Sequence, residues 1–300
     1  MNQDNWVSDF SGSDKEFGEN ASIIDLDQNT KHHIVFVQEE IKLETAVNFS
    51  QYVYDKRLIT IIGELHGTTF PCEGNSTTIE DYVNDVVNSN DESKILLEYN
   101  RNDDPMSTSS IVINNVYNTL KKNNRINHII PFDERNFFLT PQYHFALYSQ
   151  DLRVSSHNIL SFSQKEIFDR YVTPYYVNNN AFNIDPNEYP PEAYSFFVNT
   201  YLPDIDNNFK YLLVNDLPRW DKDKKPLVTK LKNIWKKVTD FYILRELFKN
   251  DGTTEIIIIL GDSHRVNIQS VMESANFKKL KKISGSKENC VSLFQTYKFN

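Results

Sequence analysis

The chain has 300 residues, of which 39% are hydrophobic and 13% aromatic, and this composition excludes wholesale disorder. Its formal net charge of −9 argues against a nucleic-acid groove across the whole surface, because phosphate binding needs concentrated lysine and arginine. Length alone allows one large α/β domain or two smaller ones.

The two cysteines, Cys72 and Cys290, provide neither a disulfide framework nor a multi-cysteine zinc site. Residues 1–27 are acidic and polar and lack the apolar core of a secretory signal, and no stretch approaches the length of a membrane span. We therefore expect a protein of the cytoplasm or another reducing intracellular compartment, with neither a membrane nor a nucleic acid as partner.

The predicted elements begin after an acidic lead. Residues 1–30 are rich in Asp, Asn, Ser and Gly, which predicts a flexible N-terminal segment. Residues 31–300 are expected to form a single α/β domain. An edge strand is predicted at His33–Val37, and a buried strand at Leu58–Ile62.

Alternating helices and strands follow. Thr77 and Glu80 fit a capping box before a helix, and the apolar stripe of this helix comprises Ile79, Tyr82, Val83, Val86 and Val87. A second strand is predicted at Ile95–Leu97, a helix at Ser110–Asn123 and a third strand at Ile126–Phe132. This order is typical of βα units around a parallel sheet.

The middle of the chain, about residues 141–250, carries no comparable strand and predicts a large helical insertion. Ser163 with Glu166 fits another capping box, and Pro174 is expected to interrupt the helix that begins there. Apolar residues at helical spacing predict a long amphipathic helix at Leu227–Phe248.

After the insertion, Asp251-Gly252 is expected to close the long helix before a last buried strand at Glu255–Leu260. Two edge strands are predicted at Leu280–Ile283 and Val291–Tyr297. The predicted fold is therefore α/β: a mostly parallel central sheet flanked by helices, with a large helical insertion and C-terminal edge strands.

Two short segments, residues 61–67 and 258–264, share one design: an apolar run that ends in Gly-acid-X-His. A β-branched run followed at once by glycine and polar residues is typical of a buried parallel strand that ends in a tight turn. Ligands in open α/β sheets collect at such strand ends. In a purely structural interpretation each histidine caps a helix or packs under a loop. The second copy of the motif favours a composite active site that contains His66 and His264.

Other polar residues also stand where predicted strands stop. Glu98 ends the second strand, and Asp133 and Arg135 follow the third. Right-handed crossovers would bring these residues to the same sheet edge as Glu64 and His66. In the structural alternative Glu98 is a salt-bridged carboxylate, and Asp133 and Arg135 simply pair with each other.

This set of residues fits two kinds of hydrolytic chemistry. In the first, His66 is the base, Glu64 or Glu98 orients a histidine or carries the proton, and Arg135 stabilises developing negative charge. In the second, His66 and His264 together with Glu64 or Glu98 ligate a divalent metal such as manganese or zinc that activates water. The residues fit both versions.

The anchors in their order resemble the superfamily that joins erythromycin esterases, ChaN-like haem-binding proteins and TraB/TIKI proteases. They are Gly63-Glu64-Leu65-His66, Glu98 after Leu96-Leu97, Arg135 after Phe132-Asp133-Glu134, and Gly261-Asp262-Ser263-His264, and they span roughly residues 58–265. The resemblance implies an α/β fold with its pocket at the strand ends and hydrolysis of an ester or peptide bond. TIKI-like members use a divalent metal, erythromycin-esterase-like members a histidine-activated water, and ChaN-like members bind haem iron.

The leading hypothesis is a hydrolase of an ester, lactone, amide or peptide bond, with a small molecule or a peptide as substrate. If the protein has a cofactor, we expect a divalent metal rather than haem. The alternatives are a non-catalytic protein that binds haem, a metal or another ligand in the same pocket, and a scaffold that retains the motifs only for its fold.

Overall fold

In the computed structural model of the chain, the described residues are 23–25, 33–37, 41–64, 71–99, 110–133, 135–148, 159–275, 277–284, 290–293 and 296–299. The chain forms two compact units: a sheet unit within residues 1–98, 105–130 and 252–300, and a helical unit within residues 99–104 and 131–251. The predicted α/β class is confirmed. The helical insertion predicted at about residues 141–250 falls within the helical unit. Apart from residues 23–25, the flexible segment predicted at 1–30 lies outside the described residues.

Among the described residues, the main sheet has six strands in the order β10-β4-β5-β9-β7-β8. Their bounds are β4 Ala46–Tyr54, β5 Arg57–Glu64, β7 Ser93–Leu97, β8 Ile129–Pro131, β9 Glu255–Gly261 and β10 Lys278–Ser284. β5, β9 and β7 are parallel neighbours, whereas β4 and β10 run antiparallel beside β5. Every residue of β5 and β9 is buried. The two strands carrying the repeated motif are therefore at the centre of the sheet, as their continuous apolar runs indicate.

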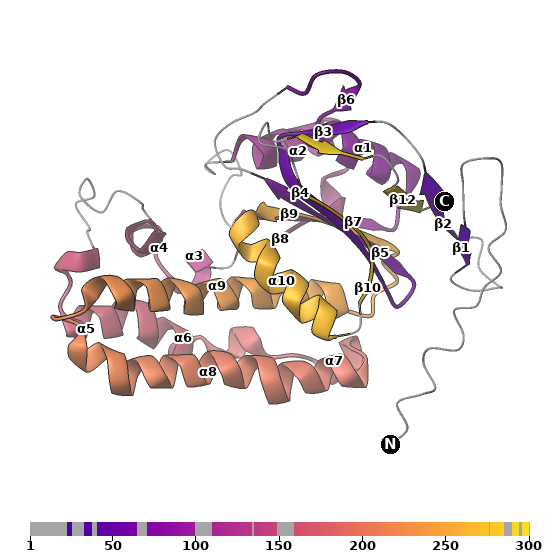
Figure 1. Ribbon diagram of the computed structural model, residues 1–300. Helices are drawn as coiled ribbons and strands as arrows, with labels where there is room; N and C mark the ends of the chain where they lie inside the picture. Colours follow the sequence, from indigo (N-terminus) through magenta and orange to yellow (C-terminus); the bar gives the residue numbers. More distant parts are fainter. Residues whose placement is uncertain are drawn as a thin grey trace. The chain divides into compact units, whose positions relative to one another are not determined.

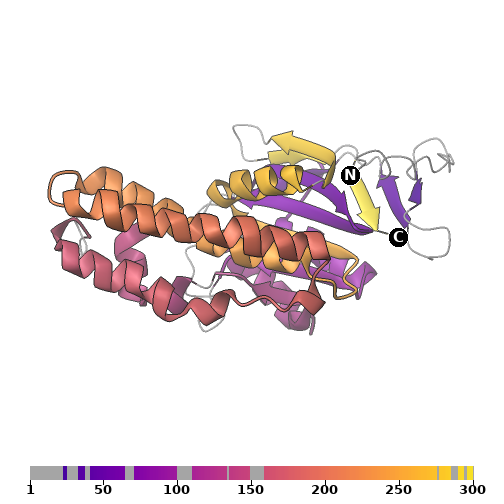
Figure 2. The ribbon, with the colours of Figure 1, turned by 90° about the horizontal axis from the view of Figure 1, so that it is seen from below.

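Helices cover both faces of this sheet. α10 (Asp262–Ser274) lies against one face, and α1 (Ile79–Ser89) and α2 (Ile111–Lys122) lie on the other (Figures 1 and 2). The predicted apolar stripe of α1 is buried, which confirms it. Its capping residue was predicted one position too early: Thr78, not Thr77, accepts from the backbone N–H of Asp81 at 3.1 Å.

The reason for this shift is that Thr77 belongs to the short strand β6 (Ser76–Thr77), so the helix starts only after it. Ser110 caps α2 as expected, by accepting from the N–H of Ile113 at 3.2 Å. The third predicted strand is shorter than expected. Residues 126–128 form a 3₁₀ turn, and only Ile129–Pro131 pair as β8.

Strand β4 was not predicted from the sequence; it pairs with β5 through a two-residue turn at Asp55 and Lys56. Both turn residues have positive φ, 45° and 64°. Such left-handed pairs are typical of type I′ hairpins, where the backbone twist of the turn matches that of the strands. Lysine is not one of the residues that mark this turn in sequence, so the hairpin had no recognisable signal.

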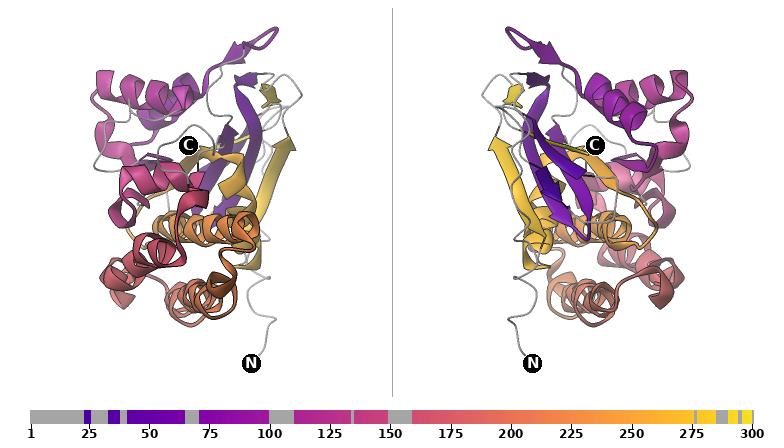
Figure 3. Two further views of the ribbon diagram at one scale, coloured as in Figure 1. Left: turned by 90° about the vertical axis from the view of Figure 1, so that its left-hand side faces the viewer. Right: turned by 90° about the vertical axis from the view of Figure 1, so that its right-hand side faces the viewer.

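The chain ends contribute to two small sheets. β2 (His33–Val37) is a strand as predicted, but it is the middle strand of the sheet β1-β2-β12 and not an edge strand. Three strands stand where two C-terminal edge strands were predicted. β10 is the edge of the main sheet, while β11 (Cys290–Ser292) and β12 (Thr296–Phe299) belong to separate sheets. Figure 3 shows β10 in yellow along the outer edge of the sheet. The remaining strands are β1 (Ile23–Asp25) and β3 (Lys42–Glu44), and the second small sheet has the order β11-β3-β6.

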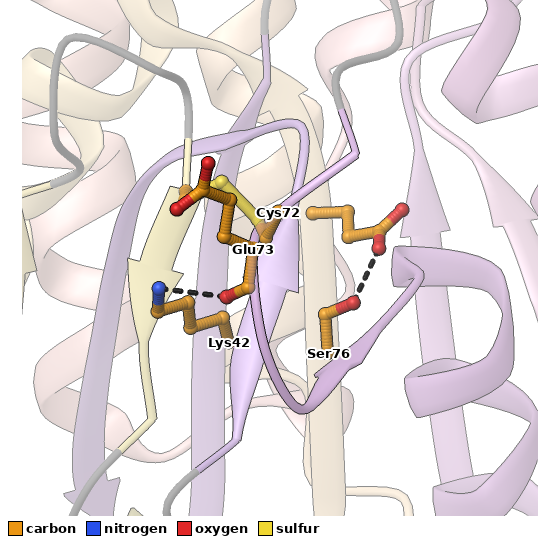
Figure 4. The surroundings of a disulfide bond; sticks show 6 residues. Lys42, Cys72, Glu73 and Ser76 are labelled. Carbon is orange, nitrogen blue, oxygen red and sulfur yellow. Dashed lines mark hydrogen bonds between the residues drawn. A yellow bond between two sulfur atoms is a disulfide. The ribbon is translucent and has the colours of Figure 1, made fainter.

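A disulfide joins Cys72 and Cys290, which are 218 residues apart in sequence (Figure 4). It links the loop that follows the first motif to β11. Beside it, the Lys42 ammonium donates to the backbone oxygen of Glu73 at 2.8 Å. The two cysteines, from which no disulfide framework was expected, are thus joined to each other.

No helix in the described part of the chain is long and apolar enough to cross a membrane.

The helical unit confirms the predicted helical middle. Its helices are α3 (Arg135–Phe138), α4 (Pro141–Tyr148), α5 (Gln164–Ile167), α6 (Thr173–Val177), α7 (Pro191–Phe196), α8 (Leu202–Tyr211) and α9 (Lys224–Phe248). Ser163 and Glu166 form the predicted capping box. α8 and α9 lie side by side (Figures 1 and 2). The buried indole N–H of Trp235, on α9, donates to the backbone oxygen of Tyr171 at 3.1 Å.

Prolines within these helices are accommodated by π-helical turns. Three such turns, 168–172, 197–201 and 212–216, each end two residues before a proline, at Pro174, Pro203 and Pro218. Proline has no N–H and its ring clashes with the carbonyl four residues earlier, and a wider turn relieves that clash. Pro174 therefore does not interrupt the helix as predicted, because the chain continues as α6.

Candidate functional site

The register of the sheet brings the two motifs together. In β5 and β9, Gly63 is the direct partner of Leu260, and Glu64 is the partner of Gly261. On the other side of β9, Leu97 of β7 pairs with Ile259, so Glu98 follows one residue later. Parallel neighbours end at the same sheet edge. Glu64 and Glu98 therefore flank the end of β9 from its two sides.

Glu98 and His264 are in contact at this edge. The Oε1 atom of Glu98 lies 3.4 Å from Nε2 of His264, and the two side chains are only 8% and 5% exposed. A hydrogen bond across this distance would run from Nε2–H to the carboxylate, because a carboxylate only accepts. The pair forms a buried imidazole held by a carboxylate, which is the arrangement that orients a histidine for proton transfer.

The second oxygen of Glu98 fixes the carboxylate to the start of α10. Its Oε2 atom accepts from the backbone N–H of Gly261 at 2.8 Å. Gly261 is the N-cap residue of α10, and His264 stands in the first turn. A carboxylate is favourable at the positive end of a helix. The glycine of the second motif, predicted only to allow a tight turn, thus also donates its backbone N–H to Glu98.

Glu64 is almost completely buried, with 1% of its surface exposed. A carboxylate at the buried end of a central strand is unusual, because charged groups lose hydration when they enter the protein interior. Its Cα is paired with that of Gly261, the residue whose N–H binds Glu98. The acidic positions of the two predicted strand ends, Glu64 and Glu98, therefore lie around one residue of β9.

Asp133 and Arg135 pair with each other in the helical unit, as the structural alternative predicted. The Nε and Nη2 atoms of Arg135 donate to the two oxygens of Asp133 at 2.7 and 2.8 Å. The backbone N–H of Arg135 adds a third bond at 3.1 Å. Both side chains are buried, at 8% and 11% exposed. This bidentate ion pair positions the start of α3.

His66 lies outside the described residues, as do all of residues 65–70. Among the residues that the structure describes, no group of three His, Cys, Asp or Glu side chains could hold a metal ion. Of the predicted metal ligands, the described part of the chain brings Glu98 to His264 and buries Glu64 nearby in sheet register.

A similar buried group lies at the opposite end of the sheet. Ser93, His128 and Glu255 are each at most 4% exposed, and Ser93 pairs with Glu255 across β7 and β9. Nδ1 of His128 lies 2.9 Å from the backbone oxygen of Ser93 and 3.4 Å from its hydroxyl. A carbonyl oxygen only accepts, so Nδ1 carries the proton and cannot take one from the hydroxyl. This group is a matched control for the site.

A chain of buried polar side chains between α10 and β4 was not predicted from the sequence. Arg265, Gln269 and Ser50 are linked by hydrogen bonds of 2.7 and 2.8 Å between α10 and β4. Ser50 is 219 residues from Gln269. The helical spacing of Arg265 and Gln269 was visible, but nothing in the local pattern identified their partner.

The comparisons add no identification: no family model, no curated protein and no solved structure matches the chain.

Proposed function

We propose that this protein is a hydrolase that cleaves an ester, lactone, amide or peptide bond at the carboxyl ends of β5, β9 and β7. The observation that carries the proposal is the buried contact between Glu98 and His264 at the end of two neighbouring parallel strands. Open α/β sheets bind their ligands at such ends. Buried imidazole held by a carboxylate is suited to move a proton to and from water.

The proposed chemistry follows from the donor pattern. With Nε2–H directed at Glu98, Nδ1 is the position of the neutral ring that accepts a proton. Nδ1 would take a proton from water as its oxygen attacks the carbonyl carbon. The imidazolium, stabilised by Glu98, would then give that proton to the leaving oxygen or nitrogen. One water is consumed and the bond is split into an acid and an alcohol or amine.

Developing negative charge on the carbonyl oxygen needs hydrogen-bond donors. The first turn of α10 offers backbone N–H groups that have no acceptor within the helix, at its positive end. His66, two residues after the buried Glu64, is the second proposed base, on the strength of the repeated motif. In the metal-assisted version of the proposal, Glu64, Glu98 and the two histidines would ligate manganese or zinc.

The test compares two histidines that are equally buried, at 4% exposed. His264→Gln and His128→Gln are assayed with p-nitrophenyl acetate, a fluorogenic lactone and fluorescent casein, which represent esters, lactones and peptide bonds. We expect His264→Gln to lower kcat/KM by about 10²–10⁴-fold. His128→Gln should keep the kcat/KM of the natural chain but have a lower melting temperature. Equal activity of the two variants, or no hydrolysis of any probe by the natural chain, contradicts the proposal.

A second pair tests the carboxylate. Glu98→Gln removes the charge beside His264, whereas Glu255→Gln removes a charge from the amino end of β9, where Asn90 donates to Glu255 at 3.3 Å. Only the first change should lower kcat. Assays after dialysis against a chelator, with manganese or zinc restored, separate the metal-assisted version from the metal-free one.

A further inference from the structure

His264 lies on a helix whose start has no side-chain cap. The N-cap residue of α10 is Gly261, and no side chain caps the helix there. Two features already hold the start of α10: β9 runs directly into it, and the N–H of Gly261 donates to Glu98. A buried polar chain begins at Arg265, the residue after His264, and it leads from α10 to the neighbouring sheet.

The chain has two links. Nη1 of Arg265 donates to Oε1 of Gln269 at 2.7 Å, one helical turn along α10. Nε2 of Gln269 donates to Oγ of Ser50, on β4, at 2.8 Å. The three residues are 8%, 5% and 0% exposed. Buried hydrogen bonds of this length allow little sliding of the helix over the sheet, because any displacement leaves polar atoms without partners.

We propose that Gln269 is a positioning residue for His264. By tying α10 to β4, it helps to set where the first turn of the helix stands, and so to hold Nε2 of His264 against Glu98. The 3.4 Å contact between His264 and Glu98 is long for a hydrogen bond, so its alignment depends on the support of the helix rather than on its own strength. This inference rests on the proposed function of the Glu98–His264 pair.

The test uses three variants of the hydrogen-bonded side chains that link α10 to β4. Gln269→Leu removes both links. Gln269→Glu keeps both, because a carboxylate accepts from Arg265 and from the hydroxyl of Ser50. Ser50→Ala removes the sheet end alone and is the milder variant if Gln269→Leu folds poorly. The matched control is Gln51→Leu, which breaks a similar buried bond on the same strand, from Gln51 Nε2 to the Thr60 hydroxyl at 3.3 Å. Successive side chains of a strand point to opposite faces, so Gln51 and Ser50 face different sides of the sheet.

The direct readout is the tautomer of His264, measured by nitrogen-15 NMR of the imidazole rings at mildly alkaline pH. The chain has 7 histidines, and comparison with His264→Gln identifies the right signal. We expect the Nε2–H form in the natural chain, Gln269→Glu and Gln51→Leu, and a mixture of both tautomers in Gln269→Leu and Ser50→Ala. With an active probe, Gln269→Leu should lower kcat by about ten- to hundredfold at nearly unchanged KM.

The outcomes separate the two proposals. If Gln269→Leu and Ser50→Ala both keep the Nε2–H tautomer, the positioning role is wrong even if His264 is essential for hydrolysis. If Gln51→Leu gives the same mixture of His264 tautomers as Gln269→Leu, the effect is general destabilisation and the inference is also wrong. If the natural chain itself lacks the Nε2–H form, the Glu98–His264 pair and the proposed function fail together.

Discussion

Glu64 and Gly261 are direct partners across the parallel strands β5 and β9, so the acidic position of the first motif stands beside the glycine of the second. That glycine in turn donates its N–H to Glu98 at 2.8 Å. Three segments that are far apart in sequence thus meet at one strand end. From the repeated motif we expected a composite site of His66 and His264 at this edge. His66 lies outside the described residues, and the described residues place Glu64, Glu98 and His264 at the edge.

The first prediction concerns His66. His66→Ala should lower kcat/KM for any probe that the natural chain hydrolyses by about 10²–10⁴-fold, because a positioned base is lost. Its melting temperature should stay nearly unchanged if the residue faces a water-filled pocket. A clearly lower melting temperature with full activity would identify His66 as a structural histidine, since lost buried hydrogen bonds cost on the order of 1–3 kcal/mol.

The second prediction concerns the disulfide. The Cys72–Cys290 bond closes a segment of 218 residues, so its loss greatly increases the freedom of the unfolded chain. Reduction should lower the free energy of unfolding by about 2–4 kcal/mol, measured by urea unfolding with and without dithiothreitol. The double variant Cys72→Ser/Cys290→Ser should have the free energy of unfolding of the reduced protein, and dithiothreitol should not change it. Equal midpoints for the oxidised and fully reduced protein would contradict this.

The third prediction concerns Tyr52. Its side chain is fully buried, and its hydroxyl has no hydrogen-bond partner among the described residues. Burial, and then the negative charge of Glu273, raise the pKa of Tyr52 to about 12 from 10.0. Tyr52→Phe should therefore stabilise the fold by about 1 kcal/mol at neutral pH, because it removes an unsatisfied polar group.

The raised pKa of Tyr52 also has a pH signature. Below pH 10.0 the hydroxyl is protonated in both states and contributes no pH dependence. Between 10.0 and about 12 the unfolded chain loses the proton first, so stability falls as pH rises through this window. Thermal unfolding scans should show a smaller alkaline loss for Tyr52→Phe. An identical alkaline profile in both proteins would exclude this assignment.

The fourth prediction concerns the buried pair Asp133–Arg135. Arg135→Gln leaves the carboxylate of Asp133 buried without its cation and should cost about 3–5 kcal/mol. Adding Asp133→Asn to it should recover part of that loss, because no charge is then left buried. Urea unfolding of the two single variants and the double variant measures the coupling. Additive losses in this cycle would show that the pair does not act as a unit.

Much of the fold is predictable from local sequence. The apolar run of residues 58–62 predicted β5, the run of residues 255–260 predicted β9, and the stripe of α1 predicted its buried face, since each element shows its own periodicity along the chain. The capping box at Ser163 and Glu166 is equally local. The hairpin before β5 was missed because Asp55-Lys56 lacks the residues that usually mark a type I′ turn.

By itself, the sequence determined which residues form the central strands and that each motif stands at a strand end. Only the tertiary structure decided that β9 lies between β5 and β7, that Cys72 meets Cys290, and that Ser50 binds Gln269. The physical reason is separation along the chain. Periodicity and caps depend on interactions within a few residues, whereas these contacts close loops of more than 150 residues and are selected only when the whole core packs.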